Sequence, residues 1–184
     1  YDPTVEKLYA PVDLDSKYVL AQDGVAPSAS NPQFHQQMVY AVAMTTIKNF
    51  ETGLGRPVLW SPHTTVVDKP VSQKKKKKAD EELIPAKKLE TEFVQRLRIY
   101  PHALRDANAF YSPQKKALLF GYFAARPADI TLQMPDNLTF TCLSHDIIAH
   151  ETTHAILDGI HRKYTEDTNP DVLAFHEAFS DIVA

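Results

Sequence analysis

The chain of 184 residues is 43% hydrophobic and 23% charged, which suits one substantial globular core and is too short for several. Its formal net charge of -3 predicts neither nucleic-acid binding nor membrane-surface binding. A single cysteine, Cys142, excludes an intrachain disulfide and leaves the redox compartment undetermined. No apolar run approaches the ~18–20 residues of a membrane span, and no signal-peptide pattern opens the chain.

The N-terminal part of the chain predicts an extended segment followed by a core helix. Residues 1–31 are rich in Pro, Asp and Ser, so we expect loops with at most a short strand. Asn31-Pro32 then opens a helical pattern that ends near Gly53 or Gly55. We interpret His35 as a surface or capping histidine, because no residue of ligand type lies four positions further on. The residues expected on the core-facing side are Phe34, Met38, Ala41, Val42 and Thr45.

The middle of the chain predicts strands on either side of a charged loop. Residues 58–60 and 64–67 are short β-prone runs. Within residues 70–90, five consecutive lysines predict a solvated loop, because adjacent like charges repel and cannot be buried. From Thr91, alternation predicts a half-buried strand on which Phe93, Leu97 and Ile99 point inward.

The next region predicts a β-hairpin and then two helices. Turn-forming residues 112–116 separate the apolar runs 108–111 and 117–123, as in a hairpin. Residues 126–143 contain two prolines and are expected to be irregular. A helix is predicted to start at Ser144, and another at Asn169-Pro170, where Asn169 is the expected N-cap.

The first of these helices contains a pair of histidines with metal-ligand spacing. His150 and His154 are four residues apart, so they lie ~5–6 Å from each other on one helix face, as two ligands of one zinc ion require. Glu151 lies ~100° around the helix, so it can act as a general base on a water molecule without binding the metal. We expect Glu177 to be the third ligand. Asp181, four residues later on the same face, is expected to accept the free N–H of a ligating imidazole.

Other histidines fit this site less well. His161 follows His154 by seven residues, or ~10 Å along an unbroken helix, and is out of register with the metzincin pattern. His176 directly precedes Glu177, so its side chain points ~100° away from that of Glu177 around the helix. This predicts that His176 lies beside the metal site and is not a ligand. A bare pair of histidines is often a coincidence of helix spacing. Here the apolar run 147–149 before the pair and the helical spacing of the later acidic pair favour a zinc site.

These motifs together resemble the gluzincin zinc peptidases. His150-Glu151-Thr152-Thr153-His154, followed by Glu177 and Asp181 in a helix rich in Ala, Phe and Ser, is most similar to the thermolysin-like branch. Upstream, Asn108-Ala109-Phe110-Tyr111 resembles that branch's substrate-binding edge strand. The resemblance covers about residues 90–184. It implies an α+β fold, a zincin-like lobe with a mainly antiparallel twisted sheet, a core helix, the active-site helix and a third-ligand helix.

The resemblance also implies an activity, namely zinc-dependent endopeptidase cleavage of a peptide or protein substrate. Glu151 takes a proton from water and delivers it to the leaving amine, and Tyr164 is the nearest match to an oxyanion-stabilising tyrosine. The Asn108 amide and the Ala109 backbone are expected to hydrogen-bond an extended substrate. Asp146 matches a calcium ligand of the family. Asp146 has two alternative roles, as a calcium ligand or as a carboxylate that complements the helix dipole. Calcium is the lesser alternative, because the other calcium ligands would lie beyond this chain.

The chain ends at residue 184 within what reads as an unfinished helix. We therefore expect residues 1–184 to form a single catalytic lobe without the family's helical C-terminal lobe. Full activity is expected to need that lobe or a partner chain. The family resemblance is compatible with secretion, and no compartment is assigned. The alternative function is a non-catalytic zinc-binding or peptide-binding module that retains the metal ligands.

Overall fold

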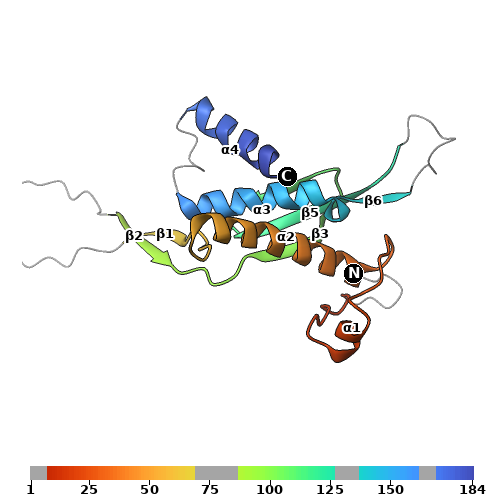
Figure 1. Ribbon diagram of the computed structural model, residues 1–184. Coiled ribbons are helices and arrows are strands. Elements are labelled where there is room, and N and C mark those ends of the chain that lie inside the picture. Colours follow the sequence, from red (N-terminus) through yellow and green to blue (C-terminus); the bar gives the residue numbers. More distant parts are fainter. Residues whose placement is uncertain (1–7, 69–86, 127–136, 162–168) are drawn as a thin grey trace, which may run out of the picture.

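The computed structural model describes residues 8–68, 87–126, 137–161 and 169–184, which form an α+β fold (Figure 1). The larger sheet is built around β5 (Ala117–Ala124). This strand pairs parallel with β3 (Arg98–Leu104) and antiparallel with both β4 (Ala109–Ser112) and β6 (Leu138–Phe140). The predicted hairpin is confirmed as β4 and β5. The sheet is mixed, because β3 runs parallel to β5.

A separate hairpin projects from one end of the body in Figure 1. It consists of β1 (His63–Asp68) and β2 (Lys87–Glu92), which pair antiparallel. The predicted strand at residues 64–67 is confirmed by β1. Residues 87–90 belong to β2, so the expected Lys-rich loop is wrong at its C-terminal end. Its remaining part, residues 70–86, lies outside the described residues.

Four helices are present in the described ranges, and three of them begin or end at the predicted residues. These are α2 (Pro32–Leu54), α3 (His145–Ile160) and α4 (Pro170–Val183). The side chains of Asn31 and Asn169 accept backbone N–H groups at the starts of α2 and α4, as Asn N-caps do. The helix α2 packs along α3, and α4 packs on another side of α3 (Figure 1).

The hydrophobic core lies between α2, α3 and the larger sheet. Its apolar side chains come from both helices, from the central strand β5 and from the 3-10 turn η1 (Thr141–Leu143). Burial of these side chains from distant parts of the sequence provides the main stabilisation of the fold. The buried members are Val39, Ala43, Leu118, Phe120, Cys142, Ile148 and Ala155.

The predicted core-facing side of α2 is right in part, because Met38 and Val42 pack against the core. The fully buried stripe is His35, Val39, Ala43 and Thr46, one residue on from most of the expected positions. The prediction missed this stripe because it contains His and Thr, whose burial is made possible by polar partners rather than by apolar character. In particular, His35 is 1% exposed, so its interpretation as a surface or capping residue is wrong.

Four further predictions are corrected. The segment expected to be extended contains the short helix α1 (Lys17–Ala21). The strand expected over residues 91–99 is divided between β2 and β3, and Phe93 between them is 75% exposed. Residues 58–60 lie in no strand, and the region expected to be irregular includes β6 and η1.

No helix in the described ranges is both long enough and apolar enough to cross a membrane.

Gly121, on β5, leads to a prediction about stability. A Cβ atom there would clash with the backbone carbonyl oxygens of Asp106 and Asn108, which cannot move without displacing the chain before β4. We expect Gly121→Ala to lower the free energy of unfolding by about 1–3 kcal/mol in a denaturant titration.

The matched control is Gly53→Ala in α2, where a Cβ atom meets nothing within 4 Å among the described residues. Alanine is a better helix former than glycine, so this change is expected to raise stability by about 0.5–1 kcal/mol. Equal stability of the two variants would contradict the close approach at Gly121.

Candidate metal centre

Three predicted ligand side chains converge where α4 packs on α3. The Nε2 atoms of His150 and His154 are 2.9 Å apart. Glu177 reaches across from α4, and its carboxylate oxygens lie 3.3 Å from His150 Nε2 and 3.6 Å from His154 Nε2. One ligand atom from each residue lies within 4.8 Å of the others. Two imidazole nitrogens and a carboxylate oxygen are a donor set that suits zinc.

Asp181 fixes the tautomer of His150. Its Oδ1 lies 2.9 Å from Nδ1 of His150, which is the contact expected from the helical spacing. Because an ionised carboxylate can only accept a hydrogen bond, Nδ1 of His150 carries the proton. Nε2 is therefore the nitrogen that faces His154 and Glu177, and a proton or a cation must lie between the two facing nitrogens.

The second histidine of the pair is held by α4 in a different way. Nδ1 of His154 contacts Nδ1 of His176 and lies 3.2 Å from the Ser180 hydroxyl. The rings of His154 and His176 are stacked, with centroids 4.6 Å apart. Burial, reinforced by the neighbouring histidines, lowers the pKa of His154 to about 3, so its imidazole is neutral. Neutral imidazole is the form that binds metal ions.

His176 behaves as a neighbour of the ligands, as expected. It is 7% exposed, and burial lowers its pKa more strongly than the nearby carboxylates raise it. Within the described part of the chain, its Nε2 atom is buried without a hydrogen-bond partner. The contact of His176 with His154 was not predicted, although His176 and Ser180 are four residues apart and so share a helix face.

Glu151 lies beside the ligand group and belongs to the wall of the site next to β4. Its Oε2 accepts a hydrogen bond of 2.8 Å from the backbone N–H of Tyr111. The side chain is 7% exposed. Burial raises the pKa of Glu151 to about 7, although the Tyr111 N–H and His150 act in the opposite direction. Sequence reasoning missed Tyr111, because the contact depends on how the sheet packs against α3.

The strand β4 presents a backbone edge to this site. Asn108 O accepts the Gly121 N–H at 2.9 Å, which places Asn108 in a hydrogen-bonded pair with β5. Since N–H and C=O groups alternate in direction along an antiparallel strand, those of Ala109 and Tyr111 point away from β5. The Asn108 side chain accepts the Ala109 N–H at 2.8 Å. Asn108 and Ala109 therefore lie at the edge where they were predicted to meet substrate.

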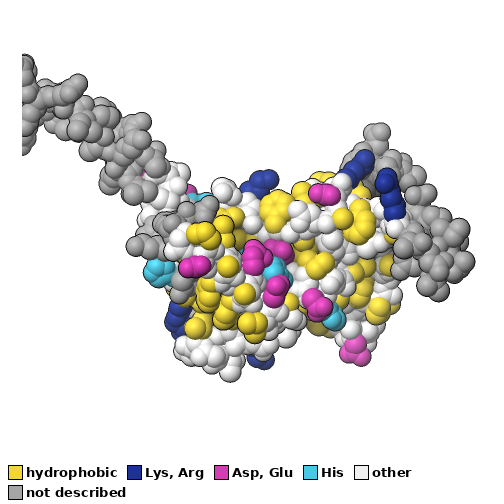
Figure 2. All heavy atoms as spheres, turned by 90° about the horizontal axis from the view of Figure 1, so that it is seen from above, with side chains coloured by type: hydrophobic (Ala, Val, Ile, Leu, Met, Phe, Trp, Pro, Cys, Tyr) yellow, Lys and Arg dark blue, Asp and Glu magenta, His cyan; other side chains and the backbone are white. Residues whose placement is uncertain are grey.

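Two hollows meet at His150, Glu151 and Ala109. One, of about 330 Å³, extends past Phe110 and Tyr111 toward Leu173 on α4. The other, of about 360 Å³, extends past Asn108 toward Asp146 and Asp181. Figure 2, which views the molecule from the α4 side, shows acidic side chains around a histidine, with hydrophobic side chains on either side. The arrangement can accommodate an extended molecule that crosses the metal-capable group along β4.

A buried ion pair connects α3 to the hairpin that carries β4. Asp158 Oδ2 accepts hydrogen bonds from the Tyr111 hydroxyl at 2.7 Å and from Lys116 Nζ at 2.9 Å. The side chains of Lys116 and Asp158 are 7% and 3% exposed, and burial raises the pKa of Tyr111. Because an unpaired buried charge is costly, these contacts hold Tyr111 at a fixed position against α3.

Two of the remaining residues considered from the sequence, Asp146 and His161, do not join the group. Tyr164 lies outside the described residues, so its role stays a prediction. Asp146 belongs to neither of the two metal-capable groups found in the described ranges, and the calcium alternative also stays a prediction. His161 follows the last residue of α3 and is likewise in neither group.

Comparison with models of known protein families, with curated proteins and with solved structures finds no match to this chain.

The contact between Asp181 and His150 leads to a prediction about metal affinity. Asp181→Asn replaces the accepting carboxylate by an amide, which weakens the hold on the Nδ1 proton and lowers the basicity of Nε2. We expect zinc affinity to fall by ~10–100-fold, measured by competition with a chromogenic chelator.

The matched control is Asp171→Asn, which removes an exposed carboxylate from the first turn of the same helix. It is expected to leave zinc affinity unchanged. Equal affinities in wild type and Asp181→Asn would remove Asp181 from the metal centre.

Proposed function

We propose that this protein is a zinc-dependent peptide hydrolase of the gluzincin type, with His150, His154 and Glu177 as the metal ligands. The single observation that carries the proposal is the pair of imidazole nitrogens 2.9 Å apart, with a carboxylate from another helix facing both. The N, N and O donor set suits zinc, and one carboxylate leaves net positive charge on a bound divalent ion, as Lewis-acid chemistry requires. When bound, zinc would supply Lewis-acid chemistry, polarising a carbonyl and lowering the pKa of a water molecule.

Glu151 is the general base of the proposed reaction. A carboxylate with a pKa near 7 can both accept a proton from water and return it to a leaving amine near neutral pH. The Tyr111 N–H holds one carboxylate oxygen, which leaves the other available for the water. The buried ion pair behind Tyr111 keeps this arrangement rigid, so Glu151 stays oriented between the ligands and the edge of β4.

The proposed substrate is a peptide segment in an extended conformation. An exposed strand edge recognises such a segment through its backbone, by adding it to the sheet as a further strand. The outward-directed backbone of Ala109 and the exposed amide of Asn108 lie at the right edge for this role, and a bound segment would replace the hydrogen bond between the Ala109 N–H and the Asn108 side chain. The two hollows beside Glu151 would take side chains on either side of the scissile bond.

One observation favours the alternative, a zinc-binding or peptide-binding module without catalytic activity. The side chains of Glu177 and Asp181 are 65% and 72% exposed, so the α4 side of the site is open to solvent in this chain. Efficient hydrolytic sites exclude bulk water around the reacting groups. The peptidase proposal therefore includes a covering lobe on that side, from the same chain or from a partner.

The two functions are separated by Glu151→Gln. This change keeps the shape of the side chain and its acceptor oxygen for the Tyr111 N–H, but removes the proton-accepting carboxylate. We expect bound zinc to stay at the wild-type level and cleavage of fluorogenic peptides, assayed with the covering lobe present, to fall by ~10²–10⁴-fold.

Glu177→Ala serves as the comparison, because it removes a ligand and is expected to lower zinc affinity and activity together. A zinc-loaded protein that, with the covering lobe present, cleaves no faster than its Glu151→Gln variant would favour the binding module. Unchanged zinc affinity in Glu177→Ala would exclude that residue as a ligand.

A further inference from the structure

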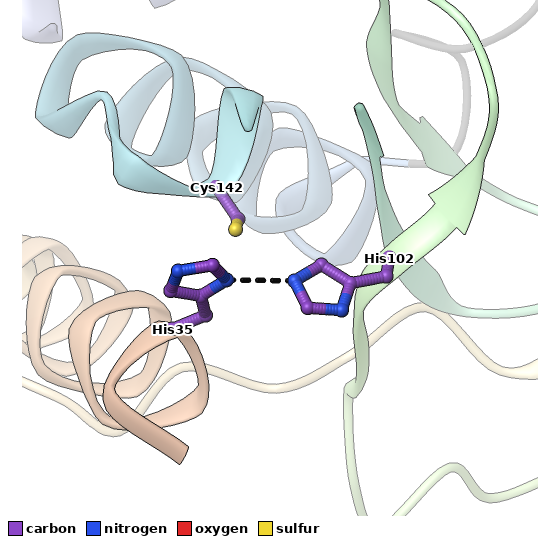
Figure 3. Close-up of side chains that lie close together, drawn as sticks. All are labelled: His35, His102 and Cys142. Atoms are coloured by element: carbon purple, nitrogen blue, oxygen red, sulfur yellow. Dashed lines mark hydrogen bonds between the residues drawn. The ribbon is translucent and has the colours of Figure 1, made fainter. Parts of the chain in front are cut away.

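A second group of metal-capable side chains lies where α2, β3 and η1 meet (Figure 3). His35 comes from α2, His102 from β3 and Cys142 from η1, and their rings and sulfur point toward one another. One ligand atom from each lies within 4.8 Å of the others. His35 and His102 are 67 residues apart in sequence, so no local motif reveals the group.

The tautomer of His35 prepares a nitrogen lone pair at the centre of this group. Nε2 of His35 lies 3.1 Å from the backbone carbonyl of Ala29. Because a carbonyl oxygen only accepts, Nε2 carries the proton, and Nδ1 of the neutral ring presents its lone pair to His102 Nε2 at 2.7 Å. A backbone carbonyl on the far nitrogen is the arrangement that commonly orients a metal-ligating histidine.

The surroundings of the group are apolar and largely closed. His35 and Cys142 are 1% and 0% exposed, and the Phe140 ring lies 4.6 Å from the His35 ring and 5.0 Å from the His102 ring. Burial lowers the pKa of His102 to about 4, with His35 adding to the effect, so both imidazoles are neutral. Burial raises the pKa of the Cys142 thiol to about 12, so a thiolate there needs a cation beside it.

We propose that His35, His102 and Cys142 form a second metal site, which binds one thiophilic transition-metal ion, with zinc as the candidate. One thiolate and two imidazoles are soft and borderline ligands that select zinc over calcium or magnesium, which prefer oxygen. Two nitrogens bound to one tetrahedral zinc ion are ~3.3 Å apart, so the rings separate by roughly half an ångström as the ion replaces their hydrogen bond.

On the His102 side, the site borders a hollow. His102 lines this hollow of about 820 Å³ between the segment that precedes α1, the first half of α2, and β3. An ion would enter from the hollow past His102, and a water molecule would supply the remaining ligand. The bound ion would join α2, β3 and η1, and η1 leads directly into α3, which carries His150 and His154. We therefore assign the site a role in stabilising the fold, independent of any peptidase activity.

Cobalt(II) titration tests this site without interference from the first one. Thiolate bound to cobalt gives a near-ultraviolet charge-transfer band. Cys142 is the chain's one cysteine, whereas the group on α3 and α4 contains no sulfur. With a non-thiol reductant present, we expect the band to appear in the wild-type chain and to be displaced by zinc. In His154→Ala, which lacks a ligand of the first site, we expect it to saturate at one cobalt ion per chain. Cys142→Ser is expected to abolish it and His102→Asn to weaken it, while His154→Ala leaves it unchanged.

Absence of the band in the folded, reduced wild-type chain under excess cobalt would overturn the proposal, as would a band of equal intensity in Cys142→Ser. Circular dichroism checks that each variant is folded, and His102→Asn at the half-buried position supplies the comparison if Cys142→Ser does not fold.

A second readout is the melting temperature of His154→Ala. We expect zinc to raise it, and the rise to disappear when Cys142→Ser is added. No rise in His154→Ala would also contradict the site.

Discussion

The constraint on which the arrangement of α3 and α4 depends is the set of contacts that α4 makes with two imidazoles of α3, whose Nε2 atoms are 2.9 Å apart. Each ring is fixed from behind by α4, His150 through Asp181 and His154 through His176 and Ser180. Glu177, from the same helix, faces both nitrogens. Facing lone pairs repel unless a proton or a cation lies between them. The interaction that would hold the two helices in register is therefore the same one that would bind a metal ion.

A second set of polar contacts extends from the same helix into the sheet. Asp158 on α3 is paired with Lys116 and with the Tyr111 hydroxyl, and the Tyr111 backbone holds Glu151. One strand thereby connects a buried ion pair to the proposed general base. Buried charges of this kind add little net stability, but removing one partner is costly, so they favour a single geometry. The position of Glu151 relative to the edge of β4 follows from that geometry.

Local patterns in the sequence predicted much of this site, and non-local contacts account for what they missed. The spacing of His150 and His154, and of Glu177 and Asp181, is helical and needs only the correct helix assignment, which the predicted helix starts at Ser144 and Asn169 provided. The turn-forming residues 112–116 likewise predicted the hairpin. In contrast, the contact of Tyr111 with Glu151 and the meeting of His35, His102 and Cys142 join elements that are far apart in sequence. His35 was misjudged because a polar residue on a core-facing position is recognised only by its partners. The zinc-peptidase resemblance itself stays a proposal, supported by this geometry.

The most direct test of the account is the structure of the zinc-loaded protein, with anomalous scattering recorded at the zinc absorption edge. The account predicts a zinc peak at ~2.0–2.2 Å from Nε2 of His150, Nε2 of His154 and one oxygen of Glu177, with Glu151 beside the ion and not bonded to it. A folded, zinc-loaded protein with no peak at this position, in which Glu177 turns to solvent and the two imidazoles bond only to each other, would contradict it.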